Sequence, residues 1–226
     1  MSWLVLAALI WTGVHVGVAG SGLRATLARR FGERGFLAGF SVLSVAAIAF
    51  LILAYRHAPT VPLWFAPPRL RDLLAVVMLL AFVLFVGAVS ARNPTMVGGE
   101  DAEPAPVAGM QRITRHPMLW SFALWAGVHV LGRGTLDGLL FFGAFLVTAL
   151  AGMPSIDAKL AARRPSVWAE LARTTSIVPF GAILAARNRF VAAEIGWITP
   201  VVAIVLWVVF LGFLHRLLFG LSPIGG

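Results

Sequence analysis

The sequence predicts an all-α fold, a polytopic integral membrane bundle of about six transmembrane helices. The first observation is composition: 60% of the 226 residues are hydrophobic and the mean hydropathy is +0.92, whereas a soluble domain is about 45–50% apolar. The second is the recurrence of apolar runs near the length that crosses a bilayer. The third is the alternation of basic and less basic loops between these runs. We therefore expect the lipid bilayer to be the main partner of this protein.

Six apolar runs approach the length of about 20 residues that a bilayer-spanning helix needs. The N-terminal run has no basic segment before it and no small-residue cleavage site after it, so we expect a retained helix and not a signal peptide. The fourth and fifth runs are joined through Gly132, Arg133 and Gly134, which predicts a tight hairpin of antiparallel helices. The six runs cover residues 2–21, 36–55, 72–91, 117–133, 135–153 and 195–219.

Basic residues outnumber acidic residues, with 18 Lys and Arg against nine Asp and Glu and a net charge of +9. Such a charge would suit nucleic acid, but its distribution favours membrane topology instead. Thirteen of the 18 basic residues fall in the first, third and fifth loops, and cytoplasmic loops are the ones enriched in Lys and Arg. We expect a multi-pass protein of the bacterial inner (cytoplasmic) membrane, with both termini in the periplasm and no nucleic-acid partner.

The chain is predicted to be one transmembrane domain (1–226) made of two three-helix halves, residues 1–97 and 110–226. The stretch GGEDAEPAPVAG at residues 98–109 is typical of a flexible linker between them. Residues 154–188 are too polar to span. Within that segment, residues 157–173 are expected to form an interfacial amphipathic helix, with a plain cytoplasmic loop as the alternative. The expected lipid-facing side chains of this helix are Leu160, Val167, Trp168 and Leu171.

One six-residue phrase occurs twice, as WTGVHV around His15 and as WAGVHV around His129. Under the predicted topology the two phrases run antiparallel across the membrane, as the matching parts of a 3+3 inverted repeat would. In each phrase a Trp stands four residues before the His and therefore shares its helix face. Trp11 is thus expected beside His15, and Trp125 beside His129. Small residues nearby would let a flat group or a second helix approach each backbone.

A histidine inside a membrane span is a candidate functional residue, because polar side chains are costly there. For a single His the alternative is a hydrogen bond to a neighbouring helix, but a matched pair favours ligation. The chain has no Cys, which excludes thiolate sites. A Zn or Fe ion bound without a cofactor usually needs a third protein ligand, and neither helix supplies a carboxylate. Axial ligation of a haem iron by His15 and His129 needs only two imidazoles.

Several longer stretches resemble one known family. In the second half they are TRHPMLWSFALWAGVHVLGRG, GMPSIDAKL and TSIVPFGAIL, which begin at Thr114, Gly152 and Thr175. In the first half, Leu23-Arg24 and FSVLSVAAIAFLILAYRHAP are similar to the same family. On these motifs the chain resembles the NnrU family, which also contains the plant 15-cis-ζ-carotene isomerase, over nearly its whole length.

The resemblance implies a membrane haem b protein with two axial histidine ligands, which correspond here to His15 and His129. Ala126 stands where the plant enzyme has a cysteine three residues before its second ligand, so a mechanism that needs this thiolate is not expected. Haem propionates are anionic and pair well with guanidinium groups. The predicted cofactor-binding residues are His15, His129, Trp11, Trp125, Arg24, Arg115, His116 and Arg133, with His15 and His129 as metal ligands.

Two classes of function follow from the resemblance. The first is a haem-dependent cis-trans isomerase or oxidoreductase that acts on a lipophilic, polyene-like substrate. The second is a non-catalytic haem protein that supports nitrogen-oxide metabolism, the denitrification to which bacterial members are linked, together with a redox partner protein. His57 and His215 are expected at the membrane interface and not as ligands.

Arg115 and His116 also allow an alternative function, that of a membrane methyltransferase. They also resemble the boundary motif of membrane methyltransferases that bind S-adenosylmethionine, although only Asp157 and Glu170 follow them, without the adjacent acidic pair of that motif. The structural interpretation of the same two residues is an interface anchor, because Pro117 begins a helix directly after them.

Overall fold

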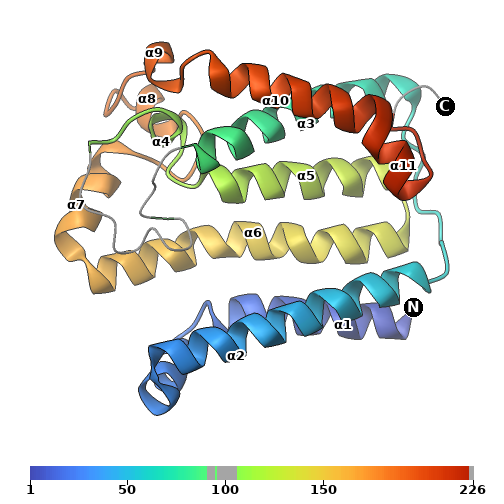
Figure 1. Cartoon of the computed structure of the whole chain (residues 1–226), viewed down its shortest axis with the longest axis horizontal. Coiled ribbons are helices and arrows are strands. Elements are labelled where there is room, and N and C mark those ends of the chain that lie inside the picture. Colours follow the sequence, from blue (N-terminus) through green and yellow to red (C-terminus); the bar gives the residue numbers. More distant parts are fainter. Residues whose placement is uncertain (91–94, 96–105, 224–226) are drawn as a thin grey trace.

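The computed structural model describes residues 1–90, 95 and 106–223, and over these ranges the protein is all-helical (Figure 1). The one extended pairing in the described chain is an isolated bridge between Pro62 and Thr135. Two segments, η1 and η2, are π-helical. The described elements are α1 (Ser2–Thr12), η1 (Gly13–Val18), α2 (Leu23–Arg56), α3 (Pro68–Val89), α4 (Met110–Ile113), α5 (Pro117–Arg133), α6 (Leu136–Arg163), α7 (Pro165–Thr174), α8 (Gly181–Leu184), α9 (Ala192–Ile195), α10 (Ile198–Val209), η2 (Phe210–Leu214) and α11 (His215–Phe219).

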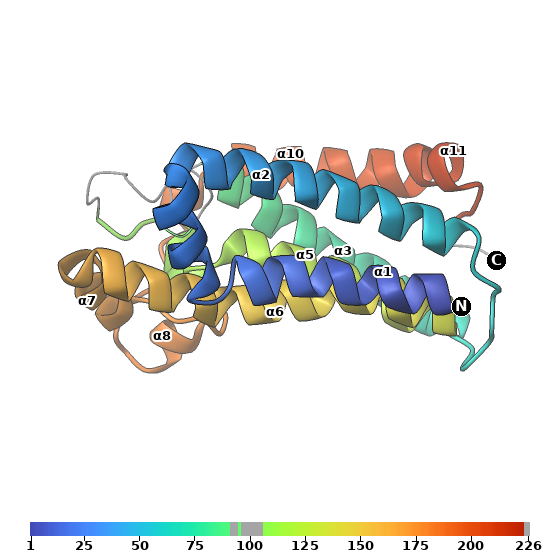
Figure 2. The same cartoon turned by 90° about the horizontal axis from the view of Figure 1, so that it is seen from below.

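The long helices pack side by side in the order α2, α1, α6, α5, α3 and α10. α6 therefore lies between α1 and α5, as Figure 1 shows. α1 and α6 run in the same direction, and α5 runs opposite to both. Figure 2 shows α2 and α10 on the same side of the layer that holds α1, α5 and α6. The two predicted halves interleave, because α1 packs on α6 while α3 packs on α5 and α10.

Helices occupy all six positions at which the sequence predicts a span. Four of them are long and apolar enough to cross a membrane, namely Leu23–Arg56, Pro68–Val89, Leu136–Arg163 and Ile198–Phe219. Each buries at most 33% of its most apolar stretch inside the protein, so most of that surface is left for lipid to cover. The helix Ser2–Val18 is apolar but shorter, and α5 has 17 residues. The fold class is confirmed, while the number of six spans stays a prediction.

The predicted amphipathic helix at residues 157–173 is wrong in its bounds and its orientation. α6 continues through Pro154 to Arg163, and the chain breaks at Arg164 (φ −138°, ψ 68°) because Pro165 disfavours a helical residue before it. α7 then begins with that proline at its first turn. Two of the four side chains expected to face lipid are instead in the protein interior: Leu160 is 6% exposed and Leu171 is 5% exposed.

The first predicted loop is helical as well. α2 begins at Leu23, thirteen residues before its predicted start at residue 36, and bends at Gly32, where φ is 74° and ψ is 159°. That positive φ suits glycine because a side chain would be strained there. The bend places the basic start of α2 at the end of the bundle that also carries α4, α7 and α8 (Figure 1). This end, called the basic end below, holds the described parts of the first, third and fifth predicted loops.

The predicted hairpin between the fourth and fifth helices is confirmed. α5 ends at Gly134 in the left-handed conformation (φ 63°), and Thr135 caps α6 by accepting a hydrogen bond from the Gly138 amide at 3.3 Å. The amides of Leu63 and Trp64 donate to the Gly134 carbonyl at 2.8 and 3.0 Å. The loop between α2 and α3 is thereby tied to the turn between α5 and α6.

The domain organisation stays a prediction. Of the predicted linker at residues 98–109, residues 98–105 lie outside the described residues. The opposite directions of α1 and α5 agree with the expected antiparallel phrases, but an inverted repeat of all three helices of each half is not established by that relation alone.

Candidate functional site

Both repeated phrases build the same local arrangement. The imidazole Nδ1 of His15 lies 2.9 Å from the Trp11 carbonyl oxygen, and that of His129 lies 2.7 Å from the Trp125 carbonyl oxygen. A carbonyl only accepts, so each Nδ1 carries the proton and donates it. The Nε2 of each ring keeps its lone pair, which is the arrangement that orients a metal-binding imidazole.

Each histidine also lies beside its tryptophan, as the spacing predicts. The ring centroids of Trp11 and His15 are 3.9 Å apart, and those of Trp125 and His129 are 5.2 Å apart. His15 lies inside the π-helical segment η1, a type of helix defect that occurs frequently at functional sites. The sequence pattern therefore predicted the surroundings of each imidazole correctly.

A row of rings on α6 connects the two phrases. Phe145 contacts both tryptophans, at centroid distances of 4.9 Å to Trp11 and 5.3 Å to Trp125. Phe142 continues the row, 5.3 Å from Trp125 and 4.7 Å from His129. The two histidine phrases thus belong to one aromatic site, called the ring row below, and not to two independent helix contacts.

The two histidines nevertheless lie at different depths along the bundle. His129 is level with Phe142 of α6 through their ring contact. Trp11 is level with Phe145, and Ser155 donates to the Gly20 carbonyl at 3.1 Å, so His15, between Trp11 and Gly20, lies about midway between those two levels of α6. The difference is about seven residues of helix, or about 10 Å at about 1.5 Å per residue.

Ligation of one iron by both imidazoles stays a prediction. Metal–imidazole bonds are about 2.0–2.1 Å long, so it would need the two ring nitrogens within about 4 Å of each other. His15 has its other aromatic contact on α2, where the Phe40 ring lies 5.6 Å away. The arrangement of α1, α6 and α5 brings the predicted pair into one aromatic site.

His215 is the imidazole that lies beside His129. Their ring centroids are 6.3 Å apart and their planes differ by 18°. The Nδ1 of His215 donates to the Leu221 carbonyl at 2.9 Å, which repeats the pattern of the other two histidines. The sequence places His215 only near a helix exit, and its contact with His129 depends on how α11 lies against α5.

Arg115 and His116 form a buried cluster with Asp157 at the basic end. The guanidinium of Arg115 donates to both carboxylate oxygens of Asp157 at 2.8 to 3.0 Å, and His116 Nε2 lies 2.8 Å from Asp157 Oδ1. The three side chains are 10%, 0% and 9% exposed. The guanidinium also lies 5.1 Å from the Trp168 ring centre. Asp157 was not among the predicted site residues, although it lies in GMPSIDAKL, one of the stretches that carry the family resemblance.

The three stretches that carry the family resemblance in the second half meet at this cluster. Thr114 Oγ1 donates to the Ile177 carbonyl at 2.7 Å, and Trp120 Nε1 donates to the same carbonyl at 2.8 Å. The Arg115 amide donates to the Ser176 carbonyl at 3.1 Å. The segment after α7 is thus fastened to the start of α5.

The other predicted cations lie in separate places. Arg24 pairs with Glu33 and lies over the Phe36 ring at 5.1 Å, all near the bend of α2. Arg133 lies one turn after His129 on α5, where it contacts Asp137 at 3.3 Å and the Tyr55 ring at 5.9 Å. Of the three predicted propionate partners, Arg133 is therefore the one near an imidazole pair.

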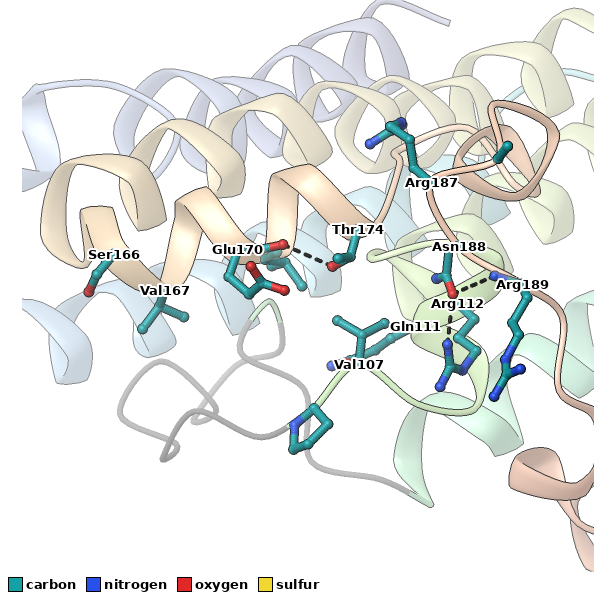
Figure 3. A pocket seen from close by; sticks show the side chains of 13 residues that line it. Val107, Gln111, Arg112, Ser166, Val167, Glu170, Thr174, Arg187, Asn188 and Arg189 are labelled. Carbon is teal, nitrogen blue, oxygen red and sulfur yellow. Dashed lines mark hydrogen bonds between the residues drawn. The ribbon is translucent and has the colours of Figure 1, made fainter.

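A cavity of about 700 Å³ opens at the basic end, between α7 and the segments before α5 and α9 (Figure 3). Arg112 lines this cavity and donates hydrogen bonds to Glu194 at 2.6 and 2.8 Å and to Asn188 at 2.7 Å. The hydrogen bonds from Arg112, and one from the Gly109 amide, lower the pKa of Glu194 to about 2. The cavity contains no histidine of the ring row.

Comparison with known proteins supports the resemblance. Residues 3–223 match the sequence model of the family described as NnrU protein. The chloroplastic 15-cis-zeta-carotene isomerase of Zea mays is 28% identical over 196 residues, which are 82% of this chain and 51% of the maize protein. The chain thus spans about half the length of this curated relative. No solved structure matches the chain.

Proposed function

The chain belongs to the NnrU family, and we propose that it is a membrane-embedded, haem b-binding isomerase that acts on a lipophilic, conjugated substrate. The named activity of the maize relative supports the reaction class. Because this chain covers half of that protein, the isomerase activity and its polyene substrate are carried over only as parts of the proposal. An apolar substrate would reach the protein from the bilayer that surrounds its four long apolar helices.

The ring row is the observation that carries the proposal. Phe145, Phe142 and the two tryptophans form a continuous series of ring contacts across three helices, and aromatic side chains pack well against a flat conjugated molecule. Histidines with free Nε2 atoms stand at both ends of the row. Aromatic surface and available imidazoles therefore occur in one site.

His129 is the residue of the ring row best placed to hold the haem iron. Its Nδ1 is fixed by the Trp125 carbonyl, and its ring is held by Phe142 on the neighbouring helix. Arg133, one turn further, offers a cation to a propionate. Haem bound there would supply one-electron redox chemistry. Ala126, which is fully buried, supplies no sulfur ligand to that site.

The proposal is tested with protein purified in detergent, loaded with haemin and supplied with 15-cis-ζ-carotene, the substrate form named for the maize relative. Chromatography of the pigment should show a cis-to-trans change that depends on reduced haem. His129→Ala should abolish it, whereas His57→Ala, an exposed change at the end of α2, should not. Haem-loaded protein that leaves the pigment unchanged would contradict the isomerase assignment.

A non-catalytic haem protein is the second candidate, and the His129–His215 contact favours it. Two imidazoles beside a bound haem would favour electron transfer over reaction with a bound molecule. Support of nitrogen-oxide metabolism through a redox partner protein belongs to this candidate. Loaded protein that exchanges electrons but does not isomerise the pigment would select it.

The methyltransferase alternative is not supported by the cluster at the basic end. The Arg115 guanidinium and the His116 Nε2 both bind Asp157 and are buried with it, so these groups are already engaged inside the protein. Calorimetry with S-adenosylmethionine should detect no binding. Binding that disappears in Arg115→Ala would reinstate this alternative.

A further inference from the structure

The cavity at the basic end carries an excess of positive charge. The charged side chains that line it are three arginines and one acid: Arg112, Arg187, Arg189 and Glu170. Arg112 is compensated by Glu194 at 2.6 Å, and Glu170 is compensated by Arg173 at 2.7 Å. Among the residues that the structure describes, no carboxylate lies within ion-pair distance of Arg187 or Arg189. The cavity therefore has two cations without an acidic partner.

The guanidinium of Arg187 is held by the end of α7. Its Nη1 donates to the carbonyls of Ala172, Arg173 and Thr175 at 2.9 to 3.0 Å. A guanidinium has five N–H donors on three nitrogens, and the Nε and Nη2 of Arg187 make no hydrogen bond within the described ranges. Arg187 is thus positioned through one nitrogen and can still donate from the other two.

The turn directly before Arg187 is strained. Ala186 has a φ of 53°, a left-handed conformation that disfavours a residue with a side chain. The turn is closed by the Ala186 amide, which donates to the Ile183 carbonyl at 3.0 Å, and by the Arg187 amide, which donates to the Ala182 carbonyl at 2.9 Å. Strained residues of this kind cluster at binding sites, and this one leads into the segment that carries the two cations.

Asn188 fixes the next part of the same segment. Its Oδ1 accepts from the Arg112 guanidinium and from the Arg189 amide, each at 2.7 Å. The Arg189 side chain is exposed and makes no hydrogen bond or ion pair with the described residues. Figure 3 shows this segment on one side of the cavity and α7 on the other. The volume of about 700 Å³ between them is that of a typical small-molecule site.

The chain on either side of Arg187 and Arg189 exposes large apolar side chains. They are Val178, Phe180, Leu184 and Phe190, with Leu184 85% exposed. Arg189 also lies nine residues before Ile198, where the last candidate membrane span begins. Basic pockets at the cytoplasmic end of membrane helices bind anionic lipid headgroups, and apolar side chains beside them enter the acyl region. The cavity therefore lies where lipid headgroups are expected.

We propose that this cavity binds the phosphate headgroup of an anionic membrane lipid through Arg187 and Arg189. A lipid phosphate accepts charge-assisted hydrogen bonds from guanidinium groups, and its acyl chains pack against the exposed apolar side chains nearby. A soluble phosphate compound offers the same anionic group without acyl chains. The proposal does not depend on haem binding, because the cavity contains no residue of the ring row.

Native mass spectrometry of the protein in a neutral detergent tests the proposal. Phosphatidylglycerol should bind at one molecule per chain, and more tightly than phosphatidylcholine with the same acyl chains. Arg187→Gln and Arg189→Gln should each weaken the binding of phosphatidylglycerol about fivefold, as expected for a basic residue at an anionic lipid surface. Arg34→Gln is the matched control. Arg34 is exposed and lies outside the cavity, so its replacement should leave the affinity unchanged.

The two arginine variants separate binding from folding. Arg187→Gln also removes contacts with the end of α7, whereas Arg189→Gln removes no side-chain contact with the described residues and should unfold at the wild-type temperature. Equal binding of the two lipids, or equal losses of affinity in Arg34→Gln and Arg189→Gln, would overturn the proposal.

Glycerol 3-phosphate distinguishes the source of the phosphate group. It should bind much more weakly than phosphatidylglycerol, because it has no acyl chains to place against Leu184 and Phe190. An affinity equal to that of the lipid, again weakened in Arg189→Gln, would overturn the lipid assignment in favour of a soluble phosphate compound.

Discussion

His116 and Asp157 are 41 residues apart in the chain, yet the imidazole Nε2 of one lies 2.8 Å from a carboxylate oxygen of the other in the protein interior. The same carboxylate accepts from Arg115. The contact joins the start of α5 to the last turns of α6. The free energy of this contact therefore determines how strongly α5 and α6 are held together at the basic end.

Replacing Asp157 by Asn should destabilise the protein strongly. The change removes the charge that compensates the buried Arg115 guanidinium, and breaking a buried pair in this way costs about 3–5 kcal/mol. Thermal unfolding in detergent measures the effect. Glu170→Gln is the matched control, because it breaks the exposed pair with Arg173, and exposed pairs contribute about 0–1 kcal/mol. Equal losses of unfolding temperature for the two variants would show that the buried Asp157 cluster stabilises the protein no more than the exposed pair does.

The Arg112–Glu194 pair should make stability depend on pH in the acidic range. The folded protein lowers the pKa of Glu194 from 4.5 to about 2, so its contribution is fully present above pH 4.5 and is lost as the pH falls toward 2. Wild type and Glu194→Gln should therefore differ in unfolding temperature above pH 4.5 and converge near pH 2. Because the pair is at the surface, added salt should reduce the difference. A difference that grows on acidification would contradict the assignment.

Single cysteines should report the predicted topology. Thr60 follows α2 and Ser166 lies at the basic end, and both are exposed. A membrane-impermeant maleimide should label Thr60→Cys on intact spheroplasts, and should label Ser166→Cys only after lysis, because basic segments stay in the cytoplasm. The reverse pattern would invert the orientation. Labelling of both residues from outside would rule out an odd number of spans between them.

Substitution of Gly134 by Ala should be far more harmful than the same substitution at Gly220. Both residues have a left-handed backbone, with φ 63° at Gly134 and 71° at Gly220, where an L-residue costs about 1–2 kcal/mol. At Gly134 the added carbon would also lie 2.2 Å from the Trp64 carbonyl oxygen, whereas at Gly220 it would meet nothing within 4 Å. The difference in unfolding temperature between the variants isolates the contact with the loop between α2 and α3. Similar unfolding temperatures for the two variants would mean that the loop between α2 and α3 moves aside at little cost.

Hydropathy predicted the positions of the helices because lipid exposure requires long apolar runs wherever a helix faces the bilayer. It did not predict where α6 ends. Pro154 and the polar residues after it are typical of a loop, but the helix persists because Asp157 finds Arg115 and His116 inside the protein. Contacts of that kind join residues far apart in the chain, and no local pattern contains them.

For the candidate site too, the sequence predicted the local contacts and not those between distant parts of the chain. The position of Trp four residues before each His is a local rule, and it correctly placed Trp11 beside His15 and Trp125 beside His129. Whether the two imidazoles can bind one iron depends instead on how deep each lies in the bundle and on the order in which the helices pack. α6 inserts between the two phrases, and a sequence repeat carries no information about an intervening helix.

The position of α6 between α1 and α5 also bears on how the protein is made. The chain is synthesised from its N-terminus, so α1 and α2 are made while their later partner α6 is still untranslated. The Gly20 carbonyl and the Trp11 ring gain their partners only when Ser155 and Phe145, more than a hundred residues downstream, have been made. A chain truncated before α6 would leave one side of its first helix uncovered.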